Sequence, residues 1–332
     1  MSTVRQIRAW LSARRRFQFV LTVAMVMLLT GTCVGLLMVP NPILPKLRAT
    51  QQANAESLGQ AQAGDPRLAQ VRRTIEPFGQ LVTRVVATGA GHESVVVGHP
   101  AQRSEIDVLA SELGAATSAV TELWGPDWAQ STLVAVASAP AEFAALLHSV
   151  DMPSDVAAAS IAEPFAPGTQ PTAQRVVFSP DAGRRLSPDG LRTLLRHELT
   201  HVATRAVTVD GAPPWMLEGF AEYTAHRAQP HSFLDVAPTV TARVRTGELP
   251  TDLPSAAEFT GKSAVLAYEQ AWTICAFIAD RYDEPHLVAL YRRIAASKQD
   301  PTSEDRILQE VLQTTRADLI ADWRAWLSPR TA

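Results

Sequence analysis

Two histidines four positions apart, with a glutamate directly after the first, are the residues best suited to chemistry in this 332-residue chain. They are His197, Glu198 and His201, in the string His-Glu-Leu-Thr-His. On an α-helix, side chains at i and i+4 lie on one face, so both imidazoles can bind one metal ion, and Zn²⁺ suits such a pair. Glu198 would then lie beside the metal, where its carboxylate can take a proton from metal-bound water. The alternative is that the histidines are ordinary surface or core residues.

A second pair of chemically useful residues follows in the string Trp-Met-Leu-Glu-Gly-Phe-Ala-Glu-Tyr at residues 215–223. A catalytic zinc site has three protein ligands and one open position, so a third ligand is needed. If the two strings lie on antiparallel helices, Glu218 can reach the metal. Glu222, one turn further, can then accept a hydrogen bond from the other ring nitrogen of a ligand histidine. The alternative is two solvated carboxylates on an amphipathic helix.

Together the two strings resemble the gluzincin metallopeptidases, the clan that includes thermolysin and the M1 aminopeptidases, and most of all its peptidase-MA-like group. The similarity is specific over residues 187–225 and vague over roughly 104–327. It implies an enzyme, a zinc-dependent metallopeptidase that hydrolyses a peptide or protein substrate. It also implies one Zn²⁺ per chain, held by His197, His201 and Glu218, with Glu198 as the general base.

Two departures from the M1 pattern refine this expectation. Sixteen residues separate His201 from Glu218, slightly fewer than is usual in M1 enzymes, so the connection must be tighter. The Gly-x-Met-Glu-Asn signature with which M1 enzymes hold a substrate's amino terminus is absent from the sequence. We therefore expect an endopeptidase. A catalytically silent binding or scaffold module of zincin fold at the cell surface is the alternative.

The resemblance also bears on the rest of the active site. Tyr268 is similar to the tyrosine that follows the zinc ligands in M1-like enzymes and is the candidate to stabilise the oxyanion, with His231 as the rival. In this kind of domain the strand before the active-site helix usually pairs with extended substrate. Residues 175–178 (Arg-Val-Val-Phe) are the candidate for that strand, and its exposed edge would give main-chain hydrogen bonds with little sequence preference. The alternative is an ordinary strand of the sheet.

Helix signals place the two strings on consecutive helices. Ser187 is a good N-cap and Pro188 fits the first helical position, so a helix is predicted from there to about residue 206. A proline- and glycine-containing loop follows, and a second helix is predicted over residues 214–227.

The rest of the sequence predicts strands before these two helices and further helices after them. Short β-branched runs predict strands, and apolar residues at helical spacing predict helices. Strands are expected at residues 81–86, 94–97, 132–137, 158–165 and 175–178, and helices at 105–123, 142–150, 239–245, 262–282, 285–296 and 303–326. The predicted fold class is α+β: a small N-terminal sheet with helices, packed against a mainly helical C-terminal half, zincin-like, and preceded by one transmembrane helix.

The transmembrane helix is predicted over residues 17–39, which carry no charge. A helix of that length is about 34 Å long and can span about 30 Å of hydrocarbon. The basic segment 1–16 places the N-terminus in the cytoplasm and the catalytic domain outside, as a single-pass protein of the cell membrane. A cleaved signal peptide is the alternative. Residues 40–64 are predicted as a stalk, and residues 65–330 as the metallopeptidase domain, with a sheet part at 65–186 and a helical active-site part at 187–330.

Composition narrows the class of protein. Hydrophobic residues make up 46% and charged residues 19%, which is typical of a packed globular protein and excludes a disordered chain or a coiled coil. The net charge is -3, with no long basic run beyond the first sixteen residues, so no nucleic-acid partner is expected. Two cysteines are too few for a disulfide framework or a four-thiolate zinc site.

Overall fold

The computed structural model describes residues 66–331, apart from 90, 150–155 and 166–168. All described residues belong to one compact unit of the chain, residues 59–332. The predicted segments at 1–16, 17–39 and 40–64 therefore lie outside the described residues.

The strands of the described residues form one mixed sheet. Their order is β1-β2-β3-β5-β4, with the central pairs β2–β3 and β3–β5 parallel and the outer pairs β1–β2 and β5–β4 antiparallel. The strands are β1 (Val82–Thr88), β2 (His92–Gly98), β3 (Leu133–Val136), β4 (Ala158–Ile161) and β5 (Arg175–Phe178). The five runs that the sequence predicted as strands are all present. The ends of the first three differ from the prediction by one or two residues, and the fourth strand ends four residues early.

One expectation about this sheet is wrong. Residues 175–178 form β5, which is paired on both sides, with β3 and with β4, and so has no exposed edge. β4 is the outer strand. After β3 the chain first forms β4 and then returns to form β5 between β3 and β4. The sequence does not contain this order, since a short run that favours a strand does not specify which strands pair with it.

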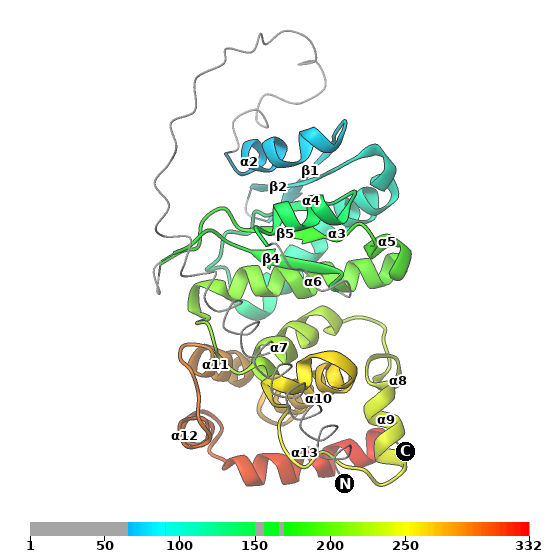
Figure 1. Ribbon diagram of the computed structural model, residues 1–332. Helices are drawn as coiled ribbons and strands as arrows, with labels where there is room; N and C mark the ends of the chain where they lie inside the picture. Colours follow the sequence, from blue (N-terminus) through cyan, green and yellow to red (C-terminus); the bar gives the residue numbers. More distant parts are fainter. Residues whose placement is uncertain (1–65, 90, 150–155, 166–168, 332) are drawn as a thin grey trace, which may run out of the picture. The chain divides into compact units, whose positions relative to one another are not determined.

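Helices cover both faces of the sheet (Figure 1). Successive strand residues point to opposite faces, so Leu133 and Ala135 pack into one core while Val134 and Val136 pack into the other. One core lies under α2 (Pro66–Ile75) and α4 (Pro140–Leu146), and the other under α3 (Arg103–Trp124) and α6 (Pro188–Thr204).

The helical half follows α6 and holds no strand among its described residues. It contains α7 (Pro214–His226), α8 (Phe233–Val236), α9 (Pro238–Arg245), α10 (Ala264–Tyr282), α11 (Glu284–Ile294), α12 (Pro301–Leu312) and α13 (Arg316–Arg330). A short helix, α5 (Ala182–Arg185), precedes α6, and 3₁₀ turns occur at Glu76–Phe78, Pro100–Gln102, Arg205–Val207, Ala256–Phe259 and Gly261–Ser263. The predicted helical region 303–326 is two helices, because Gln313 takes a left-handed conformation (φ 56°) and Thr315 caps a new start.

The fold class needs one further correction. None of the helices in the described part of the chain is long and apolar enough to cross a membrane. The two longest of them are amphipathic. α3, with 22 residues, presents Asp107 and Glu122 to solvent, and α10, with 19 residues, carries Asp280 and Arg281 in its last turn. The structure is a mixed α/β domain with a small sheet and a helical C-terminal half. We therefore withdraw the predictions of a transmembrane helix, of the membrane as a partner and of a single-pass location in the cell membrane.

Local sequence explains where α6 begins. Ser187 is its N-cap, and the Oγ atom accepts a hydrogen bond from the backbone nitrogen of Gly190 at 3.1 Å. Leu191, Leu195 and Leu199 then form a buried stripe along the helix. This stripe fixes the rotation of α6, so that His197 and His201 face the neighbouring helix α7.

The contact between α7 and α10 is unusually close at Gly219. A Cβ atom at this position would lie 2.3 Å from the backbone oxygen of Ala271 and 2.8 Å from the sulfur of Cys275. Only glycine allows this approach, which brings the face of α10 that carries Tyr268 against Glu218 of α7.

Candidate metal centre

Three side chains from α6 and α7 converge to form a cluster that could hold a metal ion: His197, His201 and Glu218. The Nε2 atoms of the two histidines are 2.9 Å apart. The Oε2 atom of Glu218 lies 3.2 Å from Nε2 of His197 and 3.5 Å from Nε2 of His201. Each residue thus contributes one donor atom to the same small volume.

These distances fit a single tetrahedral zinc ion. Ligands held about 2.0–2.1 Å from a metal at the tetrahedral angle are about 3.3 Å from one another. The three observed separations lie on either side of that value. Two imidazole nitrogens and one carboxylate oxygen also form the donor set of known catalytic zinc sites, which leave a fourth position for water or substrate.

Glu222 supports this cluster from the next turn of α7. Its Oε1 atom lies 3.0 Å from Nδ1 of His197, the nitrogen that does not face the other ligands. A carboxylate in this position fixes the tautomer and the ring orientation of a ligand histidine and makes the ring more basic. The structure therefore places Glu222 where the sequence predicted it.

The electrostatic character of the cluster favours a cation. Burial alone would raise the pKa of Glu218, but the charge of His201 and hydrogen bonds from both histidines hold it well below its usual value. Burial would likewise raise the pKa of Glu222, but hydrogen bonds from His197 and His226 lower it to about 2. Both carboxylates therefore stay ionised at neutral pH, and each can face a positive charge, whether a protonated imidazole or a bound cation.

Glu198 and Tyr268 are the remaining predicted site residues. Glu198 is 6% exposed and directly follows His197 on α6. Tyr268 reaches the cluster from α10, and its ring packs edge-on against Phe259 with centroids 5.2 Å apart. Burial and the nearby charges of Glu218, Glu222 and Glu198 raise the pKa of the Tyr268 hydroxyl. It therefore stays protonated at neutral pH and can donate a hydrogen bond.

His231, the rival of Tyr268, lies elsewhere. It is an exposed residue of the loop after α7, and its Nδ1 atom contacts Nδ1 of His226 at 3.0 Å. Glu222 stands between this pair and the three donor atoms, since His226 contacts Glu222 and Glu222 contacts His197. Of the two candidates, Tyr268 is the one that the fold brings next to Glu198 and Glu218.

Polar anchors hold the two helices of the site in place. On α6, Arg196 donates from Nε to Glu112 of α3 at 2.7 Å. At the start of α7, the indole nitrogen of buried Trp215 donates to Glu304 at 2.5 Å. At its far end, Arg227 donates to Glu284 of α11. Each bond ties α6 or α7 to an element distant in sequence, which limits movement of the donor atoms.

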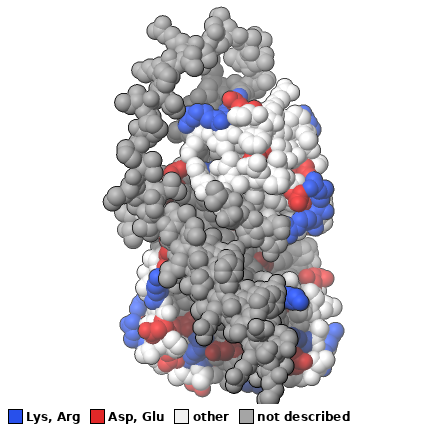
Figure 2. All heavy atoms as spheres, viewed as in Figure 1, with Lys and Arg blue, Asp and Glu red and all other residues white. Residues whose placement is uncertain are grey.

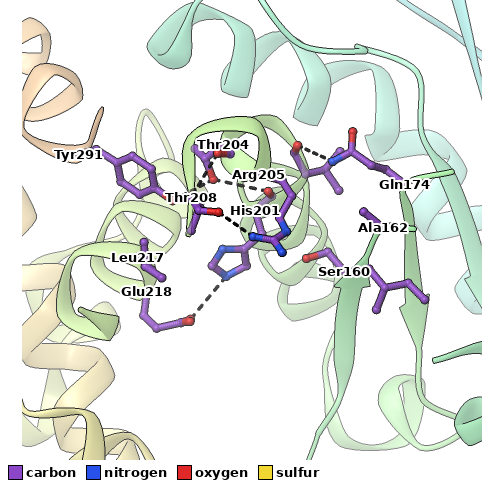
Figure 3. Close-up of a pocket in the computed structure, with 12 residues that line it drawn as sticks. Ser160, Ala162, Gln174, His201, Thr204, Arg205, Thr208, Leu217, Glu218 and Tyr291 are labelled. Carbon is purple, nitrogen blue, oxygen red and sulfur yellow. Dashed lines mark hydrogen bonds and ion pairs between the residues drawn. The ribbon is translucent and has the colours of Figure 1, made fainter. Parts of the chain in front are cut away.

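A cavity of about 250 Å³ opens beside His201 and Glu218 (Figure 3). The edge strand β4 forms one wall through Ser160 and its neighbours, and the end of α6 with the start of α7 forms the other. The guanidinium group of Arg205 lies between these walls and donates to the backbone oxygen of Thr208 at 2.7 Å. The cavity therefore lies between the cluster of His197, His201 and Glu218 and β4, the outer strand of the described sheet.

Charged side chains of both signs are interspersed on the visible part of the surface in Figure 2. Blue and red atoms alternate most densely over the lower end of the view, which belongs to the helical half.

Sequence reasoning missed two contributions to this site. The first is Gly219, where a glycine in the middle of a helical pattern is a recognisable sign of close packing. The second is β4, whose edge position depends on strand order and left no sign in the sequence.

No protein-family model and no curated protein sequence matches the chain. Among solved structures, it is similar to an M1 zinc metallopeptidase from Deinococcus radiodurans, with 17% identity and a TM-score of 0.47 over 76% of this chain and 53% of that one. A mutant of an M1 zinc metallopeptidase from the same organism matches with 14% identity and a TM-score of 0.47, over 74% and 52%. A mutant bound to a Tyr-Ser-Ala substrate matches with 16% identity and a TM-score of 0.44, over 76% and 53%.

The chain thus spans about half the length of the solved structures that it matches. Similarity at this level concerns the course of the backbone alone. The M1 enzymes belong to the clan that the sequence resembles, and membership of this chain in the peptidase-MA-like group stays a prediction.

Proposed function

We propose that this protein is a zinc-dependent metallopeptidase that cleaves internal peptide bonds. The observation that carries the proposal is the convergence of His197 Nε2, His201 Nε2 and Glu218 Oε2 within the reach of one ion, with the buried Glu198 directly after His197 on α6. A scaffold that only bound partners would have no need of a carboxylate at the position of Glu198. Burying an ionisable group without a task costs free energy.

Each nearby side chain has a defined part in the proposed reaction. A bound Zn²⁺ would supply Lewis acidity, which polarises the scissile carbonyl and makes water more acidic. Glu198 accepts the proton of the attacking water and later delivers it to the leaving amine. Tyr268, kept protonated by its surroundings, donates a hydrogen bond to the oxyanion. Glu222 keeps the ring of His197 in the orientation that directs Nε2 toward the other donors.

The edge of β4 gives the proposed enzyme a way to hold an extended substrate. An open strand edge offers backbone donors and acceptors in a regular row, so it can bind a peptide with little dependence on side-chain identity. The cavity between β4 and α6 then takes one substrate side chain next to the scissile bond, since about 250 Å³ is room for a side chain and not for a folded segment.

Endopeptidase specificity follows from how such a substrate would be held. Pairing along β4 engages the middle of an extended segment and needs no chain terminus. The sequence also lacks the Gly-x-Met-Glu-Asn string that binds a free amino terminus in M1 enzymes. We therefore expect cleavage sites to lie within a peptide, several residues from either end.

A mixture of synthetic peptides, analysed by mass spectrometry, tests the proposal. The full chain should cut internal bonds, and Glu198→Gln should bind the same amount of zinc while turnover falls about 10²- to 10⁴-fold, the range for loss of a general acid–base group. Glu93→Gln is a matched control, because Glu93 is an exposed carboxylate on β2. Equal cleavage by the parent and by Glu198→Gln would refute the assigned mechanism. Release of single terminal residues would refute the endopeptidase assignment.

A further inference from the structure

Two histidines at the far end of α7 form a second cluster that the proposed reaction does not use. His226 is the last residue of α7, and His231 lies in the loop that leads to α8. Their Nδ1 atoms are 3.0 Å apart, and their rings are inclined by 65° with centroids 5.2 Å apart. This separation is close to the 2.9 Å between the ligand nitrogens of His197 and His201.

Glu222 determines which nitrogen of His226 is available. The Nε2 atom of His226 lies 3.5 Å from Oε2 of Glu222, and a carboxylate attracts the proton of the imidazole to that side. In the neutral ring, Nδ1 then carries a lone pair, and it is directed at His231. His197 contacts the same carboxylate with the two ring nitrogens exchanged. Its Nδ1 faces the other oxygen of Glu222, and its Nε2 faces Glu218 in the first cluster.

We propose that Nδ1 of His226 and Nδ1 of His231 form a second metal site, which takes a divalent transition-metal ion such as Zn²⁺. Imidazole is a suitable ligand for zinc, copper and nickel. Two ligands of a tetrahedral zinc ion are about 3.3 Å apart, and a shift of a few tenths of an ångström opens the present 3.0 Å to that distance. His231 is exposed, so water can supply the remaining ligands.

The surroundings hold the two rings in a geometry suited to this role. Trp272 of α10 packs edge-on against His226 with centroids 6.3 Å apart, and Phe233 packs on Trp272 at 5.3 Å. These aromatic contacts form a wall that restricts rotation of His226. The carboxylate of Asp235 interacts electrostatically with His231 and adds negative charge near the site.

The second site would be coupled to the first through one side chain. Glu222 contacts His197 with one oxygen and His226 with the other, so a metal ion that withdraws electrons from His226 strengthens its hold on Glu222. Filling of the second site therefore changes the affinity of the first, and the reverse effect has the same magnitude. This coupling does not depend on whether the protein is a peptidase.

Zinc binding to the full chain tests the proposal. The metal-free protein is titrated with Zn²⁺ in equilibrium dialysis, with metal analysis of both compartments. We expect about two zinc ions per chain, one bound tightly and one more weakly, because three protein ligands hold an ion better than two. His231→Gln should lose the weaker ion alone. His231 is the better choice for substitution than His226, which contacts Glu222 and would disturb both sites.

Two further variants make each outcome decisive. His286→Gln removes an exposed histidine that is bonded to Asp283, and it should keep both ions. His197→Ala should lose the tight ion and keep the weaker one, so failure of the first cluster to bind zinc is distinguishable from failure of the second. If His231→Gln binds as many ions as the parent, with the same affinities, the two rings are only hydrogen-bonded and the proposal is overturned.

Discussion

Replacement of Gly219 by alanine tests whether the contact between α7 and α10 positions the metal cluster. The added Cβ would lie 2.3 Å from the backbone oxygen of Ala271 and 2.8 Å from both its carbonyl carbon and the sulfur of Cys275. Ordinary contacts of a Cβ atom begin near 3.4 Å. The nearest obstacle is backbone and cannot rotate away, so the two helices must separate by roughly 1 Å.

The structure sets the size of the effect on stability. Overpacking of this kind costs about 1–3 kcal/mol, and contact with backbone places Gly219→Ala near the upper end. Alanine in a helix interior recovers about 1 kcal/mol relative to glycine. We therefore expect a net loss of about 2 kcal/mol in the free energy of unfolding. Glu218 directly precedes Gly219 on α7. Because a shift of roughly 1 Å far exceeds the ±0.2 Å tolerance of a metal–ligand distance, zinc affinity should fall as well.

Urea unfolding and chelator competition for zinc measure the two consequences separately. Gly114→Ala is the matched control, because Gly114 also lies inside a helix but its added Cβ would meet only the backbone oxygen of Ala87, at 3.5 Å. The control should be as stable as the parent or more stable by up to about 1 kcal/mol, with unchanged zinc affinity. If Gly219→Ala behaves like this control, the helix contact does not position Glu218 and the reasoning is refuted.

Three further predictions follow from individual contacts. Glu222→Gln should weaken zinc binding by about 10- to 100-fold, because the amide cannot polarise His197 as a carboxylate does, and unchanged affinity in chelator competition would contradict this. Tyr268→Phe should keep its zinc while kcat falls about 10²- to 10³-fold with little change in KM; a rise in KM alone would mean that the hydroxyl binds substrate instead. The hydrogen bond from Arg227 is the main reason that the pKa of Glu284 lies below its usual 4.5, so its stabilising effect is complete above pH 4.5 and is lost as the pH falls through the lowered pKa. Glu284→Gln should therefore lower the urea midpoint at pH 7 and differ less from the parent at pH 3.5, whereas an equal difference at both pH values would exclude this ion pair as the cause.

Much of the candidate site could be predicted because its residues are governed by local rules. The i and i+4 spacing of His197 and His201 requires only that α6 be a helix, and Ser187 with Pro188 marks its start. The same holds for Glu218 and Glu222 on α7. Once these two helices pack together, the side chains face one another without further information.

The rest depends on contacts between elements far apart in the chain. Whether β4 or β5 lies at the edge is decided by strand pairing, and both strands read alike as apolar runs. The break between α12 and α13 depends on a single left-handed residue, Gln313, within an otherwise helical pattern. The choice between Tyr268 and His231 required the packing of α10 on α7, which Gly219 allows.

Zinc content tests the central claim most directly. The full chain is purified without chelator and analysed for metal beside its His197→Ala and Glu198→Gln variants, after dialysis to remove weakly bound ions. We expect about one tightly bound zinc ion in the parent and in Glu198→Gln, and loss of that ion in His197→Ala. A folded parent without zinc, or a His197→Ala variant that retains it, would contradict the assignment of His197, His201 and Glu218 as a metal centre.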